Sequence, residues 1–272
     1  VLNAQNFIGK FTWTTSLNIV YNKGNILNIN GQVVEGGVGS LNRAMEGQPL
    51  GVFYTVEYAG VNSQNGDAQF YLNTTKADGS LDKTLVSNSQ YNQAQRVVVG
   101  DPNPDVIAGV TNTFGYKGFD LSIFFNGVFG NQVSVYGMGQ YSMANAIYED
   151  NQTADQMQRW TKPGDITRVP QARYYEGNGN QASSRFIVDG SFVRLRTVNF
   201  GYTFSKKVLN RIKVDRIRVY VSGQNLLTFT NNYPLWDPEV NADSFDSNIS
   251  KGNDFYTPPQ PRTILFGLNI GF

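Results

Sequence analysis

The end of the chain alternates between large hydrophobic side chains and small or polar ones. From Ile264 to Phe272, every second residue is isoleucine, phenylalanine or leucine, and the residues between them include two glycines and Asn269. Side chains of a β-strand point to opposite faces in turn, so this pattern predicts a strand with one oily face and one small or polar face. Soluble β-sandwiches and membrane barrels both use such strands, and the rest of the chain has to distinguish them.

The same alternation predicts further strands along the chain. Including the last one, we expect about seven, at residues 7–21, 51–59, 106–116, 119–129, 192–204, 216–229 and 262–272. Most are about ten to thirteen residues long, which exceeds a typical soluble strand and approaches the length that crosses a bilayer at a tilt. Aromatic residues gather near strand ends, where the interfacial girdle of a membrane barrel lies; they are Trp13, Tyr21, Tyr58, Tyr116, Phe119, Tyr202 and Phe204.

Short turns and long polar segments alternate between the predicted strands. The turns at Lys117-Gly118 and 205–214 are short, whereas the connections 61–103, 131–185 and 230–261 are long and polar. Outer-membrane barrels show this alternation, with short periplasmic turns and long extracellular loops. Only the connection 22–47 departs from it, being long for a periplasmic turn. Within the loops we expect a local hairpin around 68–72 and a short helix at 153–160 with Thr153 as its N-cap.

The composition narrows the class of protein. Charged residues make up 16% of the 272 residues and aromatic residues 13%, against about 25% charged residues in an ordinary soluble domain. Mean hydropathy is −0.34, which is too polar for a helical membrane protein. The 22 basic and 21 acidic residues nearly cancel, so the charge gives no support to nucleic-acid binding. The absence of cysteine and histidine excludes disulfides, Cys/His zinc sites and nucleophile–histidine pairs, and we expect no enzyme.

Several longer motifs occur in a fixed order. They are the segments 47–54, 112–125, 159–161, 191–202, 216–229, 237–239 and 261–272, of which the third reads Arg159-Trp160-Thr161 and the sixth Asp237-Pro238-Glu239. This series resembles the C-terminal part of the SusC/RagA-type TonB-linked (TonB-dependent) outer-membrane transporters. The resemblance extends from about residue 11 to the end of the chain.

The resemblance implies an all-β fold, a transmembrane antiparallel β-barrel that is plugged and roughly 22-stranded. Such a barrel imports glycan or peptide nutrients, is driven by TonB, is capped by a SusD-like surface lipoprotein and lies in the outer membrane of a Gram-negative, Bacteroidota-like bacterium. No plug domain or TonB box occurs, and the chain opens on Val1 in mid-pattern, so we interpret residues 1–272 as a C-terminal barrel segment. Its expected partners are the remainder of the barrel and plug, TonB through the missing N-terminal part, the lipoprotein and membrane lipid.

Two other functions are compatible with parts of the pattern. A barrel that only anchors a surface structure has the same strands but lacks a plug. A soluble glycan-binding β module has similar alternation but stacks its oily faces between two sheets. The sequence upstream of Val1 would distinguish these classes, and the substrate is not readable from the loops.

Candidate site residues lie in the expected outer loops. Aromatic side chains there either bind substrate or a partner or pack between loops; they are Trp160, Tyr174, Tyr175, Tyr233, Trp236 and Tyr256. No cofactor is expected, except that a run of carboxylates has the oxygen ligands of a structural Ca²⁺ site or is simply solvated; it comprises Asp237, Glu239, Asp243, Asp246 and Asp254.

Charged residues in the strands need an explanation, because a charge on the lipid face costs about 2–4 kcal/mol at the bilayer midplane. Arg194 and Arg196 share a face with Phe192 and Val198 in a regular strand, so we expect them at the outer rim or turned inward by a bulge. The cations of the turn 205–214 meet anionic headgroups or water; they are Lys206, Lys207, Arg211 and Lys213. The expected lumen lining is Thr12, Thr14, Ser16, Asn18, Asp120, Ser122 and Asn269.

Overall fold

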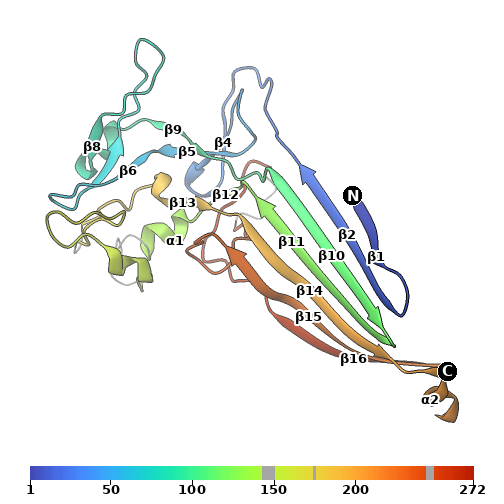
Figure 1. Cartoon of the computed structure of the whole chain (residues 1–272). Helices are drawn as coiled ribbons and strands as arrows, with labels where there is room; N and C mark the ends of the chain where they lie inside the picture. Colours follow the sequence, from blue (N-terminus) through green and yellow to red (C-terminus); the bar gives the residue numbers. More distant parts are fainter. Residues whose placement is uncertain (143–150, 174–175, 213, 243–247) are drawn as a thin grey trace.

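A seven-stranded antiparallel sheet dominates the computed structural model, which describes residues 1–142, 151–173, 176–212, 214–242 and 248–272. The strand order is β1-β2-β10-β11-β14-β15-β16, and the strands lie side by side in one curved layer (Figure 1). Their bounds are β1 (Leu2–Phe7), β2 (Phe11–Tyr21), β10 (Val106–Tyr116), β11 (Phe119–Phe129), β14 (Phe192–Thr203), β15 (Arg216–Thr230) and β16 (Thr263–Gly271).

The predicted number of sheet strands is confirmed, but one member of the set is wrong. The strand expected at 51–59 is not in the large sheet, and its place is taken by β1, which the sequence did not reveal. β1 is short, and its polar residues interrupt the alternation, so it carries a weak signal. β2 begins at Phe11 and not at Phe7, because the turn at 8–10 separates it from β1.

Because 51–59 is not a strand of the large sheet, the connection 22–47 is no longer an exception to the alternation of short turns and long loops. The segment 22–105 is one long excursion between β2 and β10 and does not contain a membrane strand. The connections at residues 8–10, Lys117-Gly118 and 204–215 then lie at one end of the sheet, and the three long loops lie at the other (Figure 1). Of the short connections, the last contains the helix α2 (Lys206–Ile212).

Smaller elements fold the long loops. The first loop (residues 22–105) holds a four-stranded sheet in the order β3-β4-β5-β9 and a three-stranded sheet β6-β7-β8. The second loop (residues 130–191) holds the pair β12-β13 and the helix α1 (Tyr136–Tyr141), and the third (residues 231–262) has no helix or strand in its described part. The strands are β3 (Val34–Gly36), β4 (Asn42–Ala44), β5 (Val52–Val56), β6 (Tyr58–Val61), β7 (Ala68–Tyr71), β8 (Leu85–Ser87), β9 (Arg96–Gly100), β12 (Gln132–Ser134) and β13 (Ile187–Asp189).

The described parts of the loops also contain short 3₁₀ segments, at Val38–Ser40, Asn88–Gln93, Ala154–Gln158 and Ser184–Phe186. The predicted hairpin around 68–72 exists as part of β6-β7-β8. The predicted helix at 153–160 is only the 3₁₀ turn Ala154–Gln158. The Thr153 hydroxyl donates to the Asp155 carboxylate and accepts no capping hydrogen bond from a backbone N–H of the turn, so the expected N-cap bond is not formed.

The hydrophobic core of the chain lies in the loops. One buried cluster contains Val56, Ala68 and Phe70 of the first loop. A second contains Val133, Val135 and Phe186 of the second loop, with side chains of the third loop packed against it. No helix in the described part of the chain is long and apolar enough to cross a membrane.

Candidate functional site

The pairing of the seven strands sorts their side chains into two chemically different faces. Residues that are directly paired in an antiparallel sheet lie on the same face. One row across the sheet is hydrophobic from edge to edge; it consists of Phe7, Trp13, Phe114, Leu121, Phe200, Val221 and Phe266. The row nearer the short turns is hydrophobic as well and consists of Phe11, Tyr116, Phe119, Tyr202, Val219 and Leu268.

These hydrophobic rows are exposed. The Phe266 side chain is 79% exposed, and aromatic neighbours contact one another along the face, as in the pair Phe119–Tyr202 at 4.5 Å between ring centroids. No second sheet of the described chain stacks on this face (Figure 1). The arrangement of a soluble sandwich is therefore wrong for this chain, since it needs the oily rows buried between two sheets.

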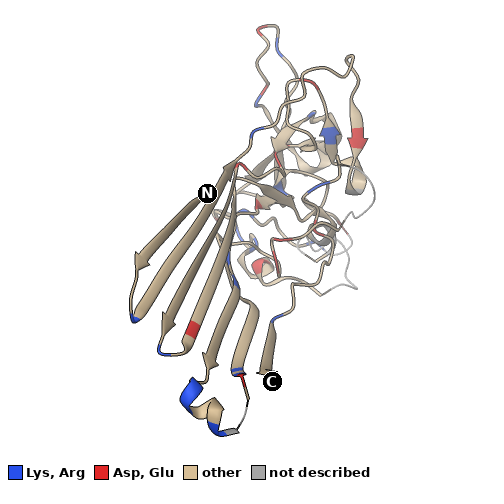
Figure 2. Ribbon diagram, turned by 90° about the vertical axis from the view of Figure 1, so that its right-hand side faces the viewer, with Lys and Arg blue, Asp and Glu red and all other residues tan. Residues whose placement is uncertain are grey.

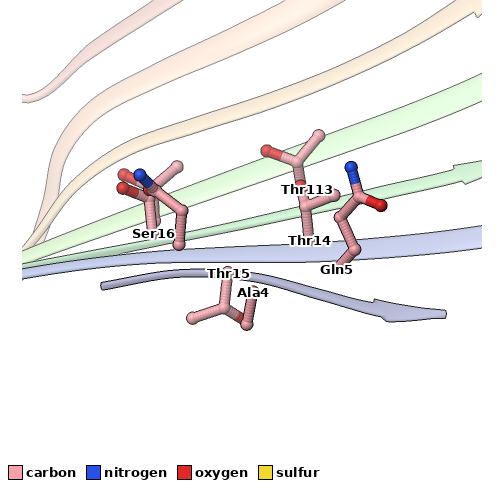
Figure 3. A pocket seen from close by; sticks show the side chains of 8 residues that line it. Ala4, Gln5, Thr14, Thr15, Ser16 and Thr113 are labelled. Carbon is pink, nitrogen blue, oxygen red and sulfur yellow. The ribbon is translucent and has the colours of Figure 1, made fainter. Parts of the chain in front are cut away.

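The opposite face is polar and almost uncharged. Its central row consists of Gln5, Thr14, Thr113, Ser122, Asn199 and Ser222, and ends at Leu265. Figure 3 shows Gln5, Thr14, Ser16 and Thr113 pointing to one side of the sheet, and Ala4 and Thr15 to the other. The polar side chains border a shallow hollow of about 430 Å³.

All seven residues predicted to line the lumen share this polar face, as the strand register requires. Its charged pair is formed by Asp120 and Arg218, whose guanidinium Nε donates to the carboxylate at 3.2 Å. Pairing leaves the face close to neutral. Such a surface suits contact with water, with hydroxyl- or amide-rich ligands or with a polar protein surface.

A bulge in β14 explains the two arginines of that strand. Phe125 of β11 pairs with Leu195 and the adjacent Phe124 pairs with Thr197, so Arg196 is an extra residue with no opposed partner on β11. A bulge changes which residues share a face. Before it Arg194 shares the polar face with Asn126, and after it Val198 lies on the oily face. The prediction that a bulge accounts for the arginines is confirmed, whereas the predicted sharing of a face with Val198 is wrong.

Both arginines hold the third loop to the sheet. Arg194, 1% exposed, donates to Asp237, which is also buried. Arg196 makes two parallel hydrogen bonds to Glu239, each of 2.9 Å. This forked geometry is the strongest that an arginine and a carboxylate form. The motif Asp237-Pro238-Glu239 is therefore a latch between the third loop and β14.

Asp237 also orders the loop around it. Its carboxylate accepts hydrogen bonds from the backbone N–H groups of Glu239 at 2.9 Å and Gln260 at 3.0 Å. Burial by itself raises the pKa of Asp237, but the Arg194 guanidinium and these two N–H groups outweigh it and hold the pKa below its usual value. The carboxylate is thus ionised at neutral pH, as the buried arginine requires.

The first and second loops are joined by buried polar side chains. Asn178 accepts from the Ala68 N–H at 2.9 Å and donates to the Gly66 carbonyl at 2.9 Å. The Thr55 hydroxyl donates to the Ala182 carbonyl at 2.9 Å. Val56 and Ser183 add an isolated parallel bridge between the loops.

The third loop closes the assembly. Asn253 donates to Asn42 Oδ1 at 2.9 Å, and the Asn42 amide donates to the Lys251 carbonyl at 3.1 Å. The backbone of Ser134 exchanges hydrogen bonds with Gly252 at 2.7 Å and Asp254 at 2.8 Å. The three long loops therefore form one folded unit above the end of the sheet, which we call the roof.

No protein-family model matches the chain, but individual relatives match its whole length. The TonB-dependent receptor P3 of Formosa agariphila is 33% identical over an alignment that covers 100% of this chain and 28% of that protein. The TonB-dependent receptor SusC of Bacteroides thetaiotaomicron is 24% identical and covers 100% of this chain and 26% of SusC. A solved structure of the RagAB peptide transporter superimposes with a TM-score of 0.80 over 99% of this chain and 28% of that chain, at 20% identity, so the fold is shared.

The chain belongs to the SusC/RagA-type TonB-dependent receptors. It spans 26–28% of the length of these two receptors. Its sheet has the fold of part of a transmembrane β-barrel wall, as predicted, and is open at β1 and β16. Receptors of this family are not enzymes, which confirms the prediction that the chain does no catalysis.

Within this receptor segment, the predicted loop aromatics differ in their surroundings. Trp160 is 6% exposed, and its indole N–H donates to the Ser63 carbonyl at 3.1 Å. The Tyr233 hydroxyl donates to Asp254 at 2.8 Å, and burial, followed by the charge of Asp254, raises the pKa of Tyr233. Trp236 is 58% exposed. Tyr256 is partly exposed and its hydroxyl lies 3.0 Å from that of Ser142, while the predicted Tyr174 and Tyr175 lie outside the described residues.

The carboxylates proposed for Ca²⁺ are not brought together in the described part of the receptor. Asp237 and Glu239 face arginines, and Asp254 accepts from Tyr233. Asp243 and Asp246 lie outside the described residues. No group of three or more acidic residues suited to a metal occurs among the described ones, and the calcium site stays a prediction.

Sequence reasoning missed the asparagines that join the loops of the receptor. Asn42, Asn178 and Asn253 are buried with their amides hydrogen-bonded between loops. The sequence shows only loops that are rich in asparagine, and exposed asparagines give the same signal. Which asparagine is buried depends on contacts between residues more than 100 positions apart.

Proposed function

We propose that this chain forms part of the wall and roof of an outer-membrane importer of glycan or peptide nutrients. The importer works with a SusD-like lipoprotein on the cell surface and with TonB on the periplasmic side. The observation that carries this proposal is the division of the seven-stranded sheet into one hydrophobic and one polar, nearly neutral face. That division suits a wall with lipid on one side and a filled or aqueous lumen on the other.

The two sheet edges support the assignment to a larger barrel. β1 and β16 are each paired on one side only. Unpaired backbone groups cost several kcal/mol each in hydrocarbon, so strands in a membrane close into a barrel. In the proposed importer both edges pair with further strands of the receptor.

The roof supports a role in handling nutrients at the cell surface. It lies at the end of the sheet opposite the short turns, which is the extracellular end of outer-membrane barrels (Figure 1). Among the described candidate aromatics, Trp236 has the most exposed side chain. We assign it to contact with the nutrient or with the lipoprotein, and assign the buried Trp160 to holding the roof together.

Cysteine labelling tests the two faces directly, because the chain has no cysteine of its own. Thr113 and Phe114 are neighbours on β10 that lie on opposite faces. In the receptor as the bacterium makes it, a small charged thiol reagent should modify Thr113→Cys much faster than Phe114→Cys. Equal labelling of both positions in the membrane contradicts the proposed wall.

Uptake distinguishes import from simple anchoring. Cells that carry the receptor should take up labelled oligosaccharides or labelled peptides, and cells that lack it should not. The two substrate classes are supplied in parallel, so the assay also decides between them. A receptor that shows the two-faced labelling but transports neither class is an anchor and not an importer.

A further inference from the structure

Basic residues gather at the short-turn end of the sheet. Lys10 and Lys117 occupy two of the short turns, and Lys206, Lys207 and Arg211 lie on α2 in the third. All five are exposed. Figure 2 shows the basic positions at the tips of the turns and on the helix.

Acidic residues do little to balance this charge. In the segment 204–218, Asp215 is the one acidic residue. It binds Lys206 through its backbone carbonyl at 3.0 Å and not through its carboxylate. Asp120, the nearest acid on β11, is paired with Arg218 on the polar face. The cations of α2 are therefore free to meet an anion from outside the chain.

A hydrophobic hollow lies on the oily face beside α2. It has a volume of about 270 Å³ and is bordered on this face by Phe200, Tyr202, Val219, Val221 and Phe266. Tyr202 contacts Phe204 at 5.0 Å between ring centroids, and α2 begins two residues later. Tyr202 and Phe204 thus extend the aromatic surface of the hollow to within two residues of the basic helix.

The separation of the two features matches a lipid. Lys206 lies four positions after Tyr202, which is at most about 13 Å at the rise of a strand. One leaflet is about half of the roughly 30 Å hydrocarbon thickness of a bilayer. A fatty acyl chain that starts at α2 therefore reaches the hollow, whereas a free phosphate ion has no apolar part that could fill it.

We propose that α2 and the adjoining hollow bind one anionic glycerophospholipid in the leaflet at the short-turn end. The phosphate contacts Lys206, Lys207 and Arg211, and one acyl chain occupies the hollow between β14, β15 and β16. The proposal rests on the proposed function in one respect, namely that the sheet spans a bilayer. It adds a lipid headgroup class to that function.

The test uses the receptor as the bacterium makes it, reconstituted in nanodiscs of phosphatidylcholine and phosphatidylglycerol. Native mass spectrometry counts the two lipids that stay bound. The unchanged receptor should retain phosphatidylglycerol in preference to phosphatidylcholine. The variant Lys206→Gln/Lys207→Gln/Arg211→Gln should lower that preference about fivefold or more, since a single surface cation accounts for roughly that factor.

Three further variants separate the effect of charge from the effect of folding. The control Lys162→Gln/Lys251→Gln removes two cations from the roof and should leave the preference unchanged. Val221→Trp fills the hollow without changing charge and should also lower retention of phosphatidylglycerol. Lys206→Arg/Lys207→Arg should retain it.

Three results overturn the proposal. In the first, the glutamine variant keeps the same lipid preference. In the second, inorganic phosphate displaces the bound phosphatidylglycerol, which shows a plain anion site. In the third, an acidic protein co-purifies through α2 in place of the lipid. Failure of the sheet to insert, seen by the Thr113/Phe114 labelling, contradicts the proposed function instead, so the two failures are distinguishable.

Discussion

Asn42 and Asn253 are 211 positions apart in the chain, yet the Asn253 amide donates a hydrogen bond of 2.9 Å to the Asn42 side-chain oxygen, and both residues are buried. The contact joins β4 of the first loop to the third loop. The Asn42 amide donates in addition to the Gly51 carbonyl at 2.8 Å. A single side chain thus fixes two turns of the first loop relative to the third.

Replacing Asn42 by alanine should loosen the roof without affecting the sheet. The change leaves the Gly51 carbonyl without its partner and the Asn253 amide with only the Lys251 carbonyl, at 3.3 Å, and an unsatisfied buried group costs about 1–3 kcal/mol. Hydrogen exchange measured by mass spectrometry should rise in β4 and in residues 248–257. The exposed Asn92→Ala serves as the control, and faster exchange in β10 or β11 would contradict the assignment.

Replacing Asp237 by asparagine should release the third loop from β14. The substitution preserves shape but leaves the buried Arg194 charge with only its longer contact to Glu239, at 3.5 Å, and breaking one partner of a buried pair costs about 3–5 kcal/mol. Glu239→Gln should have a smaller effect, about 1 kcal/mol or less, because its pair with the half-buried Arg196 is open to solvent. The protease sensitivity of residues 231–262 measures how far each variant releases the third loop. An equal effect of the two variants would rule out the Arg194–Asp237 pair as the main contact.

The latch should also open in acid. The pKa of Asp237 is lowered in the folded roof, so the unfolded loop binds the proton more readily than the folded one. The stabilisation is complete above the ordinary aspartate pKa of about 3.9 and is lost as the pH falls through the lower folded pKa. The hydrogen-exchange protection factor of the third loop, which is corrected for the pH dependence of intrinsic exchange, should therefore stay constant from neutral pH to about pH 4 and fall below it. Asp237→Asn should lack this acid step, and a transition near pH 6 would point to another group.

Deleting Arg196 should leave the two faces of the sheet in place. Arg196 is the extra residue of β14 opposite β11, so without it Arg194 stays on the polar face and Phe200 and Tyr202 stay on the oily face. Heat-modifiable mobility in gels, the usual sign of a folded barrel, should be retained in the deletion variant and in Arg196→Gln. Loss of the mobility shift in the deletion variant alone would show that the bulge itself is needed for assembly.

The buried Trp160 and the exposed Trp236 of the roof should respond differently to replacement by alanine. Trp160→Ala removes a buried ring that packs closely on Gly66, where an added Cβ would lie 2.5 Å from the ring, and should destabilise the roof by about 3–5 kcal/mol. Trp236→Ala should leave stability within about 0.5 kcal/mol and lower uptake or lipoprotein binding. Hydrogen exchange measures the stability of the roof in both variants, and labelled substrate measures uptake. An unstable Trp236→Ala variant with normal uptake would contradict the role assigned to Trp236.

The sequence was most informative where one residue pattern is enough to define the environment. The alternation from Ile264 onward gives both the bounds and the faces of β16 almost completely, because lipid and lumen impose opposite chemistry on neighbouring residues. The same rule failed for Val52–Val56, which is hydrophobic because it is buried on both faces within the roof. Periodicity alone does not separate a buried loop strand from a membrane strand.

Other features depended on contacts that no local pattern records. β1 forms a strand because β2 offers it a long partner, not because its own residues alternate strongly. The role of Arg194 required Asp237, which lies 43 positions away. The sequence marked Arg194 as a strand charge that needs an explanation and Asp237 as a candidate Ca²⁺ ligand, and only their juxtaposition shows that the two residues pair.

The placement of the hydrophobic clusters in the long loops has a consequence for biogenesis. The cluster around Phe186 includes side chains that lie before β14 and after β15 in the chain. In the proposed importer, these segments meet once the intervening hairpin has been inserted into the bilayer. We therefore expect the roof to complete its folding last, after insertion, and a defect confined to the roof should yield a receptor that reaches the membrane with an open end.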